Sequence, residues 1–112
     1  MRIHQLSSTS HDEIFFDPNF LNLFESHISF LEKSNKFTLN SLDPISVYKY
    51  EGDLFGLLNS LGIEKRYHLL IMMFNNFRSP DELKQGISLI KIPNIDEIEL
   101  IKNIYKSTTI LM

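Results

Sequence analysis

The order of apolar patterns in the second half of the chain most restricts its fold. Residues 45–50 alternate between apolar and polar side chains, as a half-buried strand does, and residues 87–92 are strand-like up to Pro93. Between them, the leucine-rich segment 54–61 predicts a short helix, and residues 64–75 predict a second, more deeply buried helix. Two helices on one face of a two-stranded antiparallel sheet would give a compact βααβ unit, which predicts the α+β class.

The flanking sequence predicts one helix on each side of this unit. Asp17-Pro18 suits the N-cap and first position of a helix, and an apolar stripe follows it as far as Lys33. Residues 37–42 could form a short strand, and a last amphipathic helix is expected over residues 96–105. The expected organisation is an extended N-terminal arm (1–16), a helix and connector (17–44), the βααβ domain (45–93), and a C-terminal helix and tail (94–112).

The composition of the chain fits one globular domain and argues against several classes of function. Its 112 residues are 43% hydrophobic and 22% charged, close to the average for globular domains. With a formal net charge of −3 and no basic run, no attraction to nucleic acid is expected. The absence of cysteine excludes disulfides and is typical of a cytosolic protein. Its polar start is not expected to act as a secretory signal, and the most apolar run, residues 69–74, is too short to span a membrane.

Several ordered motifs make the central segment resemble a LysM module. Residues 48–55, Tyr-Lys-Tyr-Glu-Gly-Asp-Leu-Phe, resemble its opening, in which a strand runs into a Gly-Asp turn that caps the first helix. Leu61-Gly62 matches the end of that helix, and Asn75 stands where the family closes its second helix with Asn. Gly86 and Ile92-Pro93 match the closing stretch, in which a glycine turn leads into a strand that ends in Ile-Pro. The resemblance implies a LysM-like fold for residues 45–93.

The departures from the ordinary LysM pattern point to a particular kind of LysM-like protein. The Thr or Ser that usually follows Gly-Asp, beside the glycan groove, is Leu54 here. The insert 77–83 resembles the LysM-like domains of contractile phage tails, which in T-even-type phages include a baseplate wedge protein. The resemblance therefore implies a structural subunit of the virion tail or baseplate, assembled in the host cytoplasm and contacting other tail subunits. The N-terminal arm is either a segment that orders on a neighbouring subunit or a frayed terminus.

The residues expected to meet a partner lie in two loops and just before the first helix. They are Gly52, Asp53, Leu54, Phe55, Phe77, Arg78, Ser79, Pro80, Phe15 and Phe16. Of the last two, one is expected to pack inside and the other to contact a partner. The alternative function is binding of peptidoglycan or chitin-type glycans through the same loops. A small cytosolic regulator that binds one protein partner is a third hypothesis.

No pattern in the chain predicts catalysis. The four histidines, His4, His11, His27 and His68, include no pair at the i, i+4 spacing of a helical metal site. The paired carboxylates Asp81-Glu82 and residues 96–99 fit helix starts, where negative charge is favourable. There is no Gly-rich phosphate loop. The chain is therefore expected to be no enzyme and to bind no metal, cofactor, nucleic acid or membrane.

Overall fold

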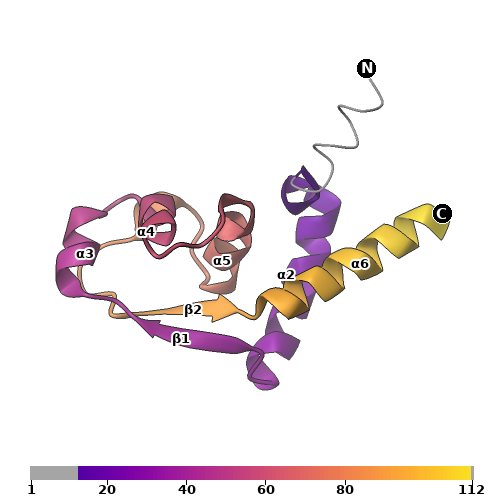
Figure 1. The fold of residues 1–112 in the computed structure, drawn as a ribbon, viewed down its shortest axis with the longest axis horizontal. Coiled ribbons are helices and arrows are strands. Elements are labelled where there is room, and N and C mark those ends of the chain that lie inside the picture. Colours follow the sequence, from indigo (N-terminus) through magenta and orange to yellow (C-terminus); the bar gives the residue numbers. More distant parts are fainter. Residues whose placement is uncertain (1–12, 112) are drawn as a thin grey trace, which may run out of the picture.

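The computed structural model describes residues 13–111, with side-chain surroundings for residues 13–107, and shows a mixed α+β fold (Figure 1). The helices and strands are α2 (Pro18–Lys33), β1 (Phe37–Ser41), α3 (Pro44–Lys49), α4 (Leu54–Ser60), α5 (His68–Phe74), β2 (Leu89–Pro93) and α6 (Ile95–Leu111). Three short 3-10 helices join them: η1 (Ile14–Phe16), η2 (Lys65–Tyr67) and η3 (Pro80–Glu82). The α+β class predicted from the sequence is confirmed.

The sheet consists of β1 and β2, which pair antiparallel. Phe37 faces Pro93 at one end of the ladder and Ser41 faces Leu89 at the other. The pairing extends one residue further, because the Leu42 amide donates to the Ser88 carbonyl over 2.8 Å. The strand predicted at 37–42 is therefore confirmed, and it is the partner of the C-terminal strand.

The strand predicted over residues 45–50 is wrong, because this segment is α3. Asp43 is its N-cap and accepts a hydrogen bond from the Ile45 amide at 3.3 Å, while Pro44 occupies the first helical turn. The Val47 amide then donates to the Asp43 carbonyl over 3.0 Å, as a helix requires. The preceding Asp-Pro pair starts a helix here, although six residues alternate between apolar and polar side chains.

The two helices predicted after Gly52 are present, although the second is interrupted. α4 begins after Asp53, and Gly62 follows its end with a φ of +81°, a conformation that glycine adopts without strain. In place of one helix over 64–75, the chain forms η2 and then α5. α5 packs on β2 and on α4, so the helices between the strands cover one side of the sheet (Figure 1).

The described part of the predicted N-terminal arm is folded onto the domain. Residues 1–12 lie outside the described residues, but Ile14–Phe16 form η1, and the Phe15 side chain is fully buried. Its ring meets Phe20 and Tyr67 edge to face, with centroids 5.7 Å and 5.4 Å away. The expectation of an extended arm as far as residue 16 is therefore wrong for residues 14–16, because a buried aromatic ring holds them in the core.

The C-terminal helix is longer than predicted and is tied to the rest of the fold by polar contacts. α6 covers residues 95–111, whereas 96–105 was expected. The Tyr105 hydroxyl donates to Asp17 at 2.5 Å, and the Tyr67 hydroxyl donates to Glu99 at 2.8 Å. Lys102, which is almost fully buried, forms an ion pair with Glu99 at 2.6 Å. Across residues 13–111, no helix has both the length and the apolar character needed to cross a bilayer.

Glu99 should make the stability of the fold depend on pH. Burial tends to raise its pKa, but hydrogen bonds from Lys102 and Tyr67 outweigh burial and hold the pKa of Glu99 below its usual value. Burial, with the bond to Glu99, raises the pKa of Tyr67 to about 12. Because the folded pKa of Glu99 is lowered, its stabilisation is present above the unfolded pKa and is lost as pH falls through the folded one.

We therefore expect Glu99→Gln to lower the free energy of unfolding by about 1 kcal/mol at pH 7, an effect discounted for partial exposure of the side chain. The difference from the parent should shrink as pH falls through the lowered pKa of Glu99, where the parent carboxylate also becomes protonated. Urea unfolding followed by circular dichroism across pH 3 to 7 would measure both. A difference that stays constant over this range would contradict the assigned role of the Glu99 carboxylate.

Candidate functional site

The structure brings together the two loops that the sequence singled out. Gly52 has a φ of +77°, and its amide donates to the Leu83 carbonyl over 2.8 Å. This bond ties the turn before α4 to the residue that follows η3, and α4 itself contacts η3. Any residue with a side chain would be strained at position 52, because the backbone there is left-handed. The backbone conformation of the turn therefore favours glycine.

Asp53 is the N-cap of α4. Its Oδ1 accepts a hydrogen bond from the Gly56 amide at 3.0 Å. A Cβ at position 56 would collide with the Asp53 carboxylate, so Gly56 leaves the room that the cap needs. Asp53 therefore holds the loop in shape, and the cap predicted from the sequence is confirmed.

Two of the residues predicted to contact a partner are buried and cannot do so. Leu54 and Phe15 have fully buried side chains, so both belong to the core. Leu54 is buried because it begins the apolar face of α4, the helix that the sequence predicts from this residue onward. Phe16 is 51% exposed, so the expectation that one phenylalanine of the pair packs inside is confirmed, and Phe16 stays the predicted contact residue.

The second predicted loop, residues 77–80, is braced by short-range hydrogen bonds. The Arg78 amide donates to Glu82 at 2.7 Å, while the Arg78 side chain is exposed. Ser79 caps η3 by accepting from the Asp81 amide at 3.2 Å. Phe77 and Pro80 are partly buried. This loop lies against the core with one exposed cation, Arg78, and lines neither of the two hollows described next.

An apolar groove of about 580 Å³ joins two of the predicted contact residues. Phe16 and Phe55 lie along it, and sequence reasoning missed the remaining lining residues, which are Gly56, Asn59, Lys65, His68 and Leu69. We call this set the phenylalanine groove. Its walls come from α4, η2 and α5, and η1 adds Phe16 to them.

The side chains of the phenylalanine groove favour binding of an apolar group. His68 is buried, with Nε2 2.8 Å from the Ile63 carbonyl, and its ring lies 5.7 Å from that of Phe55. It is therefore a structural histidine in this position. Lys65 is exposed and supplies the only cation among the lining residues. Nowhere in the described residues do three or more His, Cys, Asp or Glu side chains form a group that could hold a metal ion.

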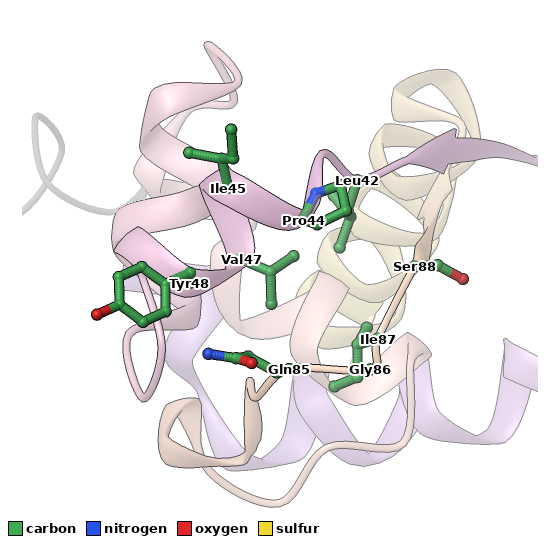
Figure 2. A pocket seen from close by; sticks show the side chains of 9 residues that line it. All are labelled: Leu42, Pro44, Ile45, Val47, Tyr48, Gln85, Gly86, Ile87 and Ser88. Carbon is green, nitrogen blue, oxygen red and sulfur yellow. The ribbon is translucent and has the colours of Figure 1, made fainter.

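A second, smaller hollow of about 360 Å³ lies between α3 and the turn before β2 (Figure 2). Figure 2 shows the side chains that line it, among them Val47 of α3 and Gln85 of the turn. Ile45 and Tyr48, three residues apart on α3, are 75% and 68% exposed. This surface was not predicted, because a strand over 45–50 would have placed Ile45 and Val47 on the same buried face.

Comparisons of the chain with protein-family models, with curated proteins and with solved structures found no match.

Proposed function

We propose that this chain is a non-enzymatic structural subunit of a phage tail or baseplate, which acts by binding a neighbouring protein. The observation that carries the proposal is the phenylalanine groove, an apolar hollow flanked by the half-exposed ring of Phe16. Exposed aromatic side chains beside an apolar pocket are typical of the anchor points of protein interfaces. Lys65 in the lining would favour a partner segment that carries an acidic residue beside its apolar anchor.

The order of elements supports a LysM-like centre as part of this proposal. β1 and β2 are antiparallel, and α4 and α5 lie between them in the chain with α5 packed on β2. α3 would then be an addition to the βααβ plan, inserted between the first strand and the Gly-Asp turn. The positions that carry the sequence resemblance have matching local roles, since Asp53 caps α4 and Asn75 ends α5. The assignment to a tail or baseplate rests on that resemblance.

Replacing Phe16 by aspartate should abolish binding of the tail partner without unfolding the domain. Phe16 is half exposed, so its loss costs little stability, whereas a carboxylate beside an apolar groove opposes docking. Leu100→Asp is the matched control, because Leu100 on α6 is equally exposed at 52%. Co-expression with the tail proteins encoded beside it, followed by affinity purification, should recover a stoichiometric complex for the parent and for Leu100→Asp only.

A glycan-binding module would give a different result in the same set of variants. The parent protein would sediment with insoluble peptidoglycan or chitin, and no complex with a tail protein would form. Such pelleting, together with the absence of a complex, would reject the structural-subunit proposal. A complex that Phe16→Asp leaves intact would reject the phenylalanine groove as its docking site.

A further inference from the structure

The two edges of the sheet differ in how their backbone groups are satisfied. In an antiparallel ladder, alternate residues direct their N–H and C=O groups toward the paired strand. Leu42 bonds to Ser88, and the Asn94 amide donates to Lys36, so the even-numbered residues of β1 face β2. Phe37, Leu39 and Ser41 therefore direct their backbone groups away from the sheet, and within residues 13–111 these groups have no hydrogen-bond partner.

The outer edge of β2 is closed to a further strand. The side-chain amide of Asn75 donates to the Lys91 carbonyl and accepts from the Lys91 amide, each over 2.7 Å, in the manner of a paired strand. Pro93, two residues on, has no N–H to offer. Both features are known means of protecting a strand edge from pairing with another chain.

The outer edge of β1 carries no such protection. The strand reads Phe-Thr-Leu-Asn-Ser, without proline and without a charge. Leu39 is 60% exposed, and Leu89, which faces Ser41 across the ladder, is 52% exposed on the same face. In Figure 1 β1 runs along the lower side of the fold with no helix below it. An uncharged edge with exposed leucines is suited to accept another strand.

We propose that β1 pairs antiparallel with β1 of a second copy of this chain, about a two-fold axis at Leu39, joining the two sheets into one of four strands. In this register Leu39 faces Leu39 of the second copy, and Phe37 faces its Ser41. All three outward-facing residues then form hydrogen-bonded pairs, with two bonds per pair and about six in all. The two Leu39 side chains, each 60% exposed in the single chain, meet on one face of the joined sheet.

The chemistry of the strand ends favours a second copy over a strand of another protein. Lys36 precedes β1 and Asp43 follows it, so an antiparallel copy brings each lysine toward the aspartate of the other chain. The uncharged strand brings no like charges together at its centre. The register is self-complementary, as a two-fold interface requires. This surface is separate from the phenylalanine groove, and the inference does not depend on the proposed function.

Sedimentation equilibrium of the full chain tests the proposal directly. Between roughly 10 μM and 1 mM the average mass should rise from 13.1 kDa toward twice that value, since a single added strand gives modest affinity. Leu39→Pro should keep the protein monomeric, because its N–H faces away from β2 and proline is tolerated at such edge positions. Leu39→Val keeps the N–H and should still associate. A monomeric parent at every concentration would overturn the proposal.

Cross-linking provides a second test that does not rely on the proline variant folding. The chain has no cysteine, so Leu39→Cys introduces one thiol on the proposed axis. Paired residues there would have Cα atoms about 5.5 Å apart, within the range of a disulfide. Mild oxidation should give at least about tenfold more covalent dimer than Leu100→Cys, a control of similar exposure. Equal yields from the two variants would reject pairing at Leu39.

Discussion

Replacing Phe20 by alanine should lower the free energy of unfolding by about 3–5 kcal/mol. The Phe20 side chain is fully buried, and its ring meets Phe15 and Tyr105 edge to face, both with centroids 5.7 Å away. It therefore joins η1 and α2, which are neighbours in the sequence, to α6 near the other end of the chain. Alanine would remove both aromatic contacts and leave a cavity that these helices cannot readily close. For a domain of this size the loss is a large part of the total stability.

Thermal unfolding followed by circular dichroism would measure this effect. The midpoint should fall by more than about 15 °C, given the usual relation between unfolding free energy and Tm in small domains. Phe30→Ala is the matched control, since Phe30 lies on the same helix but is 56% exposed. Its midpoint should change by no more than a few degrees. Equal shifts for the two variants would show that Phe20 does not hold η1 and α6 to α2.

The helix starts show which part of the fold the sequence predicts well. Asp17-Pro18 indicated the beginning of α2 correctly, because an N-cap and a first-turn proline act within a few residues. Asp43-Pro44 has the same chemistry and starts α3, although the alternation of residues 45–50 predicts a strand there. Six residues are too few to separate a short helix from a strand by periodicity. The capping pair was the stronger signal at both positions.

The pairing of the strands depends on contacts that local patterns do not contain. The strand at 37–42 was expected, but its partner lies more than fifty positions further along the chain, as in the pair Thr38 and Ile92. A wrongly assigned strand at 45–50 offered a nearer partner for the same C-terminal strand. Once α3 is recognised as a helix, the segment at 37–41 is the one that remains to pair with β2.

The candidate site was predicted only in part, for the same reason. Phe16 and Phe55 could be identified, because large apolar side chains next to a helix start or a turn are natural contact residues. The rest of the phenylalanine groove comes from η2 and the start of α5, which were expected to form one continuous helix. The break between them adds Lys65 and His68 to the lining of the groove. A spacing rule for a regular helix cannot predict that arrangement.

Asn75→Ala should lower the free energy of unfolding by about 2–4 kcal/mol, the second largest effect that we expect. The Asn75 amide donates to the Ile71 and Lys91 carbonyls and accepts from the Lys91 amide, all over 2.7 Å. Alanine removes these bonds and leaves the Lys91 amide and carbonyl without partners in a partly buried position, which costs more than the bonds themselves contribute. Asn22→Ala is the control, because Asn22 is exposed on α2.

Amide hydrogen exchange separates the local consequence of this change from global unfolding. In the parent, the Lys91 amide should be protected by Asn75 even though Lys91 directs it away from β1. In Asn75→Ala that amide should exchange faster than the amide of Ile90, which faces β1 and keeps its strand partner Asn40. If the exchange rates of the Lys91 and Ile90 amides change by the same factor, Asn75 acts only through overall stability. Selective loss at Lys91 would mean that the Asn75 side chain closes the outer edge of β2 at Lys91, beside Pro93, which has no N–H to offer, and it would leave the edge of β1 as the one open to another strand.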